Sequence, residues 1–140
     1  MRNVISDVAA PLVLGFLALG CSDSVAAPEA EVLLGQYGSS AWAVELLATR
    51  AGVELHSACG QSFVATRPAV LGSDGSFLLR GRWYQPSGRL GEMDATLKGT
   101  VAGDEVQVTL SAARPGAVPA EPLTLRRGES YEAEALPCAL

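Results

Sequence analysis

The chain has 140 residues, which is enough for one domain with a modest core. Its formal net charge is -5, with 15 acidic and 10 basic residues and no basic cluster, so we expect no nucleic acid among its partners. The sequence holds 15 glycines and 8 prolines between short apolar runs, which is typical of an all-β domain with many turns.

Residues 1–20 predict a cleaved secretory signal. A short polar start precedes an apolar run from Val8 to Leu19, which is too short for a membrane-spanning helix because a span takes about 20 apolar residues. A membrane anchor or a buried core helix is the alternative. Residues 21–31 are small, acidic and without periodicity, which predicts a flexible tether. We therefore expect the folded domain in residues 32–140.

The segment Leu17-Ala18-Leu19-Gly20-Cys21 resembles the lipobox of bacterial lipoproteins. The resemblance implies that Cys21 is acylated, becomes the first residue of the mature chain and attaches it to a membrane. Several acyl chains on one cysteine anchor a protein durably, whereas one chain binds only marginally. Ser22 differs from the aspartate that retains such proteins at the inner membrane. The resemblance thus implies a cell-envelope location, at the outer membrane and facing the periplasm if the organism is Gram-negative.

Alternating apolar and polar residues predict about seven strands after a lead-in at residues 32–37. Residues 61–67 give no clear pattern. The predicted strands occupy residues 41–49, 53–59, 69–71, 77–84, 95–101, 106–112 and 123–126.

Several positions have specific expected roles in this pattern. Trp42 begins the expected core face of the first strand. Gly52 is expected in a left-handed conformation in a three-residue hairpin loop. Gly75 is expected at positive φ, in a turn that joins 69–71 to 77–84 as a hairpin. Residues 85–93 form the longest expected loop.

The connections are too short for parallel pairing, which needs crossovers of about a dozen residues or more. We therefore predict an all-β fold, a small antiparallel up-and-down barrel of about seven to eight strands, with a β-sandwich as the alternative. Gly81 and Gly99 fit sharp bends in such a barrel. The frame Gly35-Gln36-Tyr37 resembles the Gly-x-Trp of the first strand in lipocalin-like barrels.

The sequence contains 3 cysteines. If Cys21 is acylated, Cys59 and Cys138 remain for a disulfide in an oxidising compartment. By chain entropy, a bridge that closes a loop of about 80 residues contributes on the order of 4 kcal/mol. Two buried free thiols are the alternative. No metal site and no cofactor is expected, because His56 lies on the face opposite Cys59 and no CxxC spacing occurs.

No arrangement of residues predicts an enzyme. His56 is the only histidine, and Glu54 shares its strand face, but a solvated strand face has the same appearance. The GxSxG elbow, the phosphate-binding glycine loop and the HExxH motif are all missing from the sequence.

Cationic and aromatic residues concentrate once in the sequence. This candidate binding surface for an anion or a glycan comprises Arg80, Arg82, Trp83, Tyr84 and Arg89. An ordinary solvated barrel exterior is the alternative interpretation.

The anchor, the tether and the missing catalytic motifs predict a non-catalytic envelope protein, expected to be a monomer, that binds another envelope protein as an inhibitor or assembly accessory. The alternative is a carrier for a small apolar ligand. A barrel of about eight strands is either filled by side chains or holds one small ligand. A cavity lined by Trp42, Leu46, Phe77 and Trp83 would favour the carrier.

Overall fold

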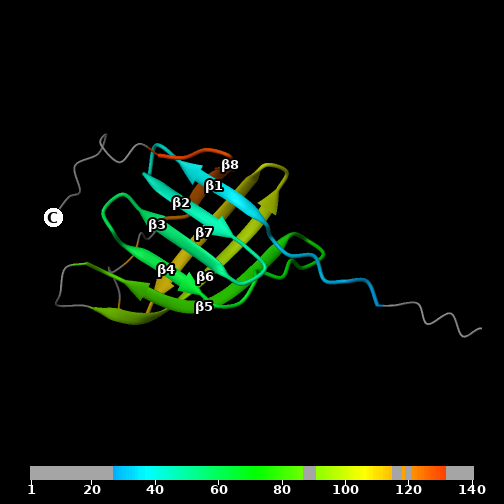
Figure 1. The fold of residues 1–140 in the computed structure, drawn as a ribbon, viewed down its shortest axis with the longest axis horizontal. Helices are drawn as coiled ribbons and strands as arrows, with labels where there is room; N and C mark the ends of the chain where they lie inside the picture. Colours follow the sequence, from blue (N-terminus) through cyan, green and yellow to red (C-terminus); the bar gives the residue numbers. More distant parts are fainter. Residues whose placement is uncertain (1–26, 87–90, 115–117, 119–120, 132–140) are drawn as a thin grey trace, which may run out of the picture.

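The structure, a computed structural model, describes residues 27–86, 91–114, 118 and 121–131. Eight strands form a closed barrel in which each strand pairs antiparallel with the next and β8 pairs with β1 (Figure 1). The predicted antiparallel up-and-down barrel is confirmed, and the alternative sandwich is wrong because the sheet closes on itself. No helix in the described ranges could cross a membrane. The strands are β1 Gly35–Ser39, β2 Val44–Ala48, β3 Val53–Ser57, β4 Ser62–Ala65, β5 Ser76–Tyr84, β6 Glu92–Ala102, β7 Glu105–Ala112 and β8 Leu123–Arg127.

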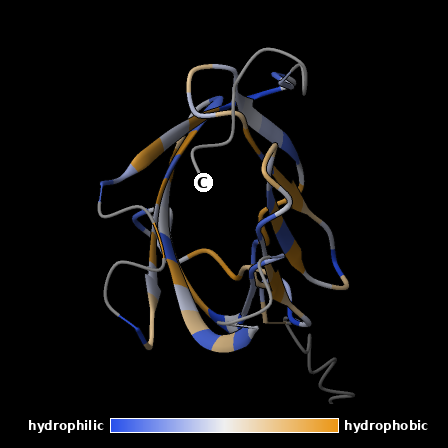
Figure 2. Ribbon diagram, turned by 90° about the vertical axis from the view of Figure 1, so that its left-hand side faces the viewer, coloured by the Kyte–Doolittle hydropathy of each residue, from blue (hydrophilic) through white to orange (hydrophobic). Residues whose placement is uncertain are grey.

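Inward-facing side chains fill the barrel. Polar and apolar residues alternate along the strands, as the colours of Figure 2 show, because successive side chains of a strand point to opposite faces. An eight-stranded barrel has an interior just wide enough for side chains to fill. The largest fully buried side chains are Tyr37, Phe63, Leu46, Leu97, Leu125, Val53, Val106 and Val108.

Two glycines within strands make room for phenylalanine rings. Gly99 pairs with Phe77 across β5 and β6, and a Cβ on Gly99 would lie 2.2 Å from the Phe77 ring. A Cβ on Gly81 would lie 2.3 Å from the carbonyl oxygen of Val64 and 2.7 Å from the ring of Phe63. These distances are far below van der Waals contact, so an aromatic ring explains Gly99, and a ring together with a backbone carbonyl explains Gly81.

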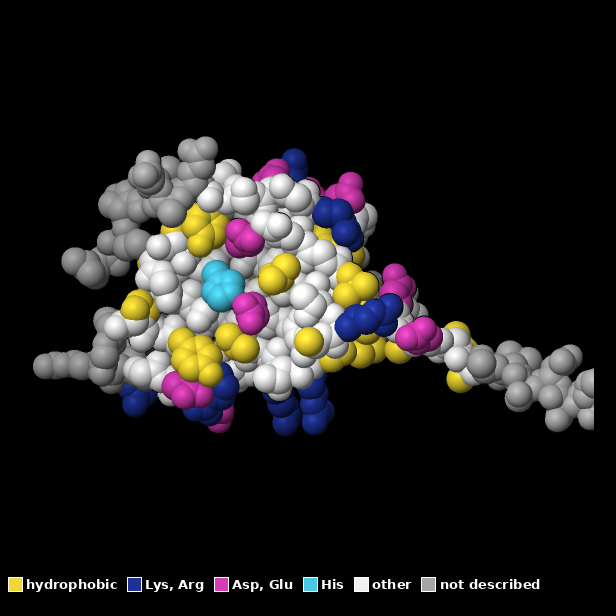
Figure 3. All heavy atoms as spheres, viewed as in Figure 1, with side chains coloured by type: hydrophobic (Ala, Val, Ile, Leu, Met, Phe, Trp, Pro, Cys, Tyr) yellow, Lys and Arg dark blue, Asp and Glu magenta, His cyan; other side chains and the backbone are white. Residues whose placement is uncertain are grey.

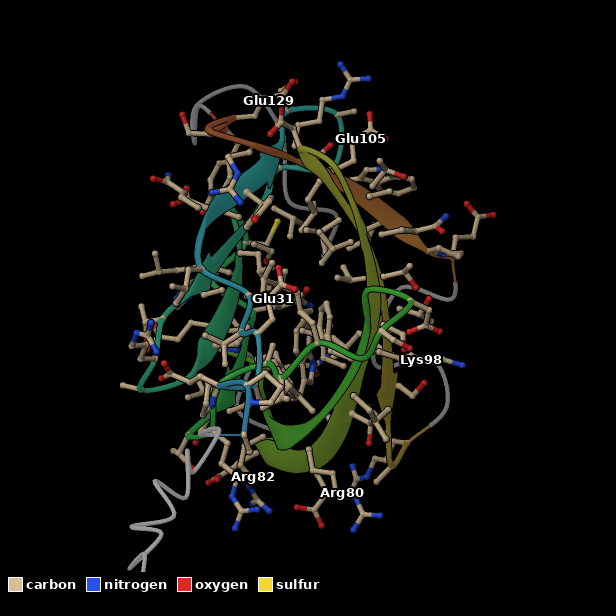
Figure 4. The ribbon with its side chains drawn as sticks, turned by 90° about the vertical axis from the view of Figure 1, so that its right-hand side faces the viewer. Glu31, Arg80, Arg82, Lys98, Glu105 and Glu129 are labelled. Carbon is tan, nitrogen blue, oxygen red and sulfur yellow. The ribbon has the colours of Figure 1, made fainter. Side chains whose placement is uncertain are left out.

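Two crossing segments close the end of the barrel from which the N-terminal segment leaves, which we call the tether end. The Leu33 N–H donates to the Ala69 carbonyl at 2.9 Å, and the Leu71 N–H donates to the Glu31 carbonyl at 2.8 Å. Leu33 is 2% exposed and Ala69 is fully buried. Figure 4 shows Glu31 in front of this mouth. The predicted hairpin of residues 69–71 with β5 is therefore wrong, because these residues pair with the N-terminal segment instead.

An arginine of β8 covers the first aromatic residue of β1 near the tether end. Arg127 Nη2 donates to the hydroxyl of Tyr37 at 2.5 Å, and its guanidinium carbon lies 4.9 Å from the Tyr37 ring centroid. A Cβ on Gly35 would lie 2.9 Å from Arg127 Nη1, and Gly35 has a φ of 126°. Gly35 thus lets the guanidinium seat on Tyr37 where the barrel closes.

The structure corrects other details of the predicted strands. Trp42 is 50% exposed, because β2 begins only at Val44 and Trp42 lies in the preceding turn. Gly52 is not left-handed; a Cβ there would meet the carbonyl oxygen of Ala65. The unassigned residues 61–67 contain β4, which pairs with β3 and β5.

The turn before β5 has the predicted geometry. Gly75 has a φ of 77°. The Ser76 hydroxyl donates to Asp74 Oδ1 at 2.6 Å, and the Ser76 backbone N–H donates to the same oxygen at 3.0 Å. The side-chain bond first, and the backbone bond second, lower the pKa of Asp74. Residues 87–90, in the predicted loop between β5 and β6, lie outside the described residues.

Replacing Gly99 should disturb the packing of the Phe77 ring. We expect Gly99→Ala to lower the free energy of unfolding by about 1–3 kcal/mol, because the new methyl group forces the ring to move. Urea denaturation measures the change. Thr100→Ala, on the exposed neighbouring position, should stay within about 0.5 kcal/mol. Phe77→Leu should recover part of the loss in the Gly99→Ala background; an unchanged loss would mean that the ring is not the cause.

Candidate functional site

The structure separates the residues of the predicted cationic and aromatic surface. Arg80, Arg82 and Tyr84 lie on the exposed face of β5, and Figure 4 shows both arginines projecting outward. Trp83 is 3% exposed and lies inside the barrel, so its assignment to this surface is wrong. The reason is the alternation of the strand, which turns Trp83 away from its neighbours. Arg89 lies outside the described residues.

Arg82 is neutralised by acidic residues of β6. Its Nε lies 2.6 Å from Glu92 Oε1, and its Nη1 lies 2.5 Å from Asp94 Oδ1. The hydrogen bonds that Arg82 donates, first to Glu92 and second to Asp94, raise the pKa of Arg82. Tyr84 donates its hydroxyl to the same Glu92 oxygen at 3.3 Å. This ion-pair network reduces the predicted positive surface to the neighbourhood of Arg80.

Arg80 lines a hollow of about 570 Å³ on the outer wall of β5, β6 and β7. Thr96 and Ser111 contribute hydroxyl groups to it, and Asp94 contributes a carboxylate. Basic side chains lie around the rim of the face shown in Figure 3, several of them along its lower edge, whereas its apolar side chains form separate spots. One arginine beside one carboxylate gives the hollow little net charge, so it is a weak candidate for anion binding.

A small pocket lies inside the other end of the barrel, which we call the far end. The far end carries the β1–β2, β3–β4, β5–β6 and β7–β8 connections, opposite the tether end. The pocket measures about 30 Å³. None of the described residues that line it carries a charge; they are Val44, Leu55, Ser57, Gln61, Trp83, Leu110 and Leu123.

Two buried polar atoms of this pocket make no hydrogen bond within the described part of the chain: Ser57 Oγ and Trp83 Nε1. An unsatisfied buried donor or acceptor costs about 1–3 kcal/mol, so such groups in native proteins need an explanation. The sequence held a signal for Ser57, because alternation places this polar residue on the apolar face of Val53 and Leu55. The presence of an indole from β5 in the same pocket could not be predicted, since it depends on the closure of the barrel.

The β1–β2 turn at the far end presents an exposed aromatic side chain. Trp42 is half exposed, and its backbone N–H donates to Ser39 Oγ at 3.4 Å. The next residue, Ala43, has a φ of 50°, which is uncommon for a residue other than glycine. Backbone strain of this kind clusters at functional sites. Trp42 was expected in the core, so the sequence did not predict this exposed aromatic group.

The remaining predicted residues lie at the far end or outside the described residues. Cys59 is exposed in the β3–β4 turn, and its sulfur is not free. Cys21 and Cys138 lie outside the described residues, so the lipidation and the disulfide stay predictions. His56 lies 3.0 Å from Glu54 on the exterior (Figure 3, cyan). Within the described ranges, no three His, Cys, Asp or Glu residues group as metal ligands.

Comparison with known proteins gives no assignment for this chain. No protein-family model, no curated protein and no solved structure matches it.

Removing the Ser57 hydroxyl, which has no hydrogen-bond partner in the described ranges, should stabilise the protein. We expect Ser57→Ala to raise the free energy of unfolding by about 1 kcal/mol. The wild-type hydroxyl loses its hydrogen bonds to water on folding, and alanine has no hydroxyl that would bear this cost. Chemical denaturation of the ligand-free chain measures the change. Ser39→Ala is the matched control, and it should lower stability because its hydroxyl accepts a hydrogen bond. A loss for Ser57→Ala as large as that of the control would show that Ser57 has a partner.

Proposed function

We propose that the protein is a non-catalytic, lipid-anchored cell-envelope protein that binds another protein through the far end of its barrel. The observation that carries the proposal is the exposed Trp42 on the strained β1–β2 turn. Tryptophan is enriched among the residues that dominate binding energy at protein interfaces. An exposed tryptophan leaves apolar area in water, and the positive φ of Ala43 strains the backbone next to it. Both features cost free energy, and binding of a partner would offset that cost.

The direction in which the N-terminal segment leaves the barrel also supports the far end as the binding surface. Residues 27–34 leave the barrel at the tether end, opposite the β1–β2 turn (Figure 1). An acylated Cys21 would hold the tether end toward the membrane. A tether of about ten residues extends at most about 3.3–3.6 Å per residue, so the barrel would stay within a few tens of ångströms of the lipid. The far end would then face away from the membrane, where a partner can reach it.

The alternative function, a carrier for a small apolar ligand, has less support. Trp42, which was expected to line the cavity, lies outside, and Leu46 and Phe77 are packed in the core. Pockets for drug-sized ligands measure about 300–1,000 Å³, whereas the far-end pocket measures about 30 Å³. We therefore place protein binding before ligand transport.

A Cys59–Cys138 disulfide at the far end belongs to the same proposal. The chain reverses at Gly128, which has a φ of 76°, and the Glu129 carbonyl then packs on Gly38. Gly38 is level with His56 through the pairing of β1, β2 and β3. The roughly eight residues that follow can extend about 26 Å, which is enough to reach the β3–β4 turn from there. The bonded state of the Cys59 sulfur also supports the bridge.

Mass spectrometry tests the anchor and the bridge together. We expect protein isolated from the native envelope to begin at Cys21, to carry the added mass of several acyl chains and to resist thiol alkylation until it is reduced. Cys21→Ser should abolish acylation and release the chain from the membrane fraction. A mature chain that begins elsewhere would contradict the anchor, and alkylation of Cys59 without reduction would contradict the bridge.

A capture experiment with the full chain tests the interface. We expect wild-type protein to capture a specific envelope protein, and we expect Trp42→Ala to reduce its affinity by about 30-fold, the effect of removing a residue worth about 2 kcal/mol. Quantitative cross-linking followed by a binding titration with the purified partner gives the measurement.

Leu78→Ala is the matched control, because Leu78 is 62% exposed on β5 and lies away from the β1–β2 turn. It should bind like the wild type. Equal loss in both variants, or equal capture by wild type and Trp42→Ala, would remove Trp42 from the interface.

A further inference from the structure

The far-end pocket combines an apolar wall with unused hydrogen-bonding capacity. The indole of Trp83 can only donate, and the hydroxyl of Ser57 can donate as well as accept. Both atoms are buried without a hydrogen-bond partner among the residues that the structure describes, and both residues line the same pocket. One acceptor oxygen with two lone pairs could satisfy both groups.

The lining of the pocket restricts the chemistry of that acceptor. The described lining residues include no arginine, lysine or histidine, so a buried carboxylate or phosphate would lack a counter-charge at high cost. The aliphatic side chains of Val44, Leu55, Leu110 and Leu123 favour an apolar group next to the oxygen. A volume of about 30 Å³ admits a small end group and excludes a drug-sized molecule.

We propose that this pocket is a binding site for a neutral carbonyl oxygen with small apolar substituents, held by Trp83 Nε1 and Ser57 Oγ. Such a carbonyl occurs in small ketones and esters and in the backbone of a peptide loop. The site goes beyond the proposed protein-binding function, because it lies inside the barrel and does not include the Trp42 side chain.

Nuclear magnetic resonance of the ¹⁵N-labelled full chain tests the site directly. The chain has 2 tryptophans, so Trp42→Phe identifies the indole N–H signal of Trp83. Titration with acetone should shift this signal downfield and saturably, because the indole gains a hydrogen bond. Xenon, which is apolar and has no acceptor, should not reproduce the downfield shift.

Two serine variants show whether the response belongs to the pocket. Ser57→Ala should weaken acetone binding about three- to tenfold, the effect of losing one neutral hydrogen bond. Ser111→Ala changes an exposed hydroxyl on the outer wall and should leave the affinity unchanged.

A second probe, N-acetylalanine N-methylamide, distinguishes the two sources of the carbonyl. Tighter binding of this probe than of acetone points to a peptide backbone, and the reverse points to a small molecule. A shift that does not saturate, or that is the same in Ser57→Ala, overturns the proposal. The proposal is also overturned if the Trp83 indole N–H signal is already downfield and protected from hydrogen exchange without a probe, and neither probe shifts it. The indole would then donate to an acceptor within the protein. Each of these results leaves the Trp42 capture experiment unaffected.

Discussion

Closure of the sheet is the constraint on which the rest of this structure depends. When β8 pairs with β1, every strand acquires two neighbours, and the inward side chains must fill a space of fixed width. Phe77 pairs with Gly99 across β5 and β6, and its ring occupies the space that a side chain on Gly99 would need. This pair therefore helps to fill the interior. Packing inside the ring of strands therefore explains Gly99.

The two ends of the barrel differ in their exposed and buried groups, and this difference underlies both of our functional proposals. Leu33 and Ala69 are buried in the segments that cross the tether end, and Arg127 covers Tyr37 beside them. The far end instead carries an exposed tryptophan on a strained turn. It also holds a pocket with two polar atoms that no described residue satisfies. Costly features of this kind persist where binding can compensate for them. This asymmetry places both of our functional proposals at one end of the molecule.

The outer wall of β5 and β6 shows why charged residues that lie close together in the sequence are a weak predictor of a binding site. Arg80 and Arg82 share a face of β5, but β6 places Thr96 opposite Arg80 and Asp94 opposite Arg82. Asp94 and the neighbouring Glu92 both pair with Arg82. Exposed ion pairs of this type contribute little to stability, but they cancel charge that a ligand would otherwise meet. Only the register between β5 and β6 decides which of the arginines is neutralised.

The sequence by itself determined the all-β class, the antiparallel pairing and the turn at Gly75, because alternation and glycine conformation are local properties. It also placed Ser57 on an apolar face. Only the tertiary structure decided that residues 69–71 pair with the N-terminal segment, that Trp42 lies outside and Trp83 inside, and that Ser57 and Trp83 share a pocket. Those outcomes depend on where strands begin and on which residues closure brings together across the barrel, and neither property is encoded in a local pattern.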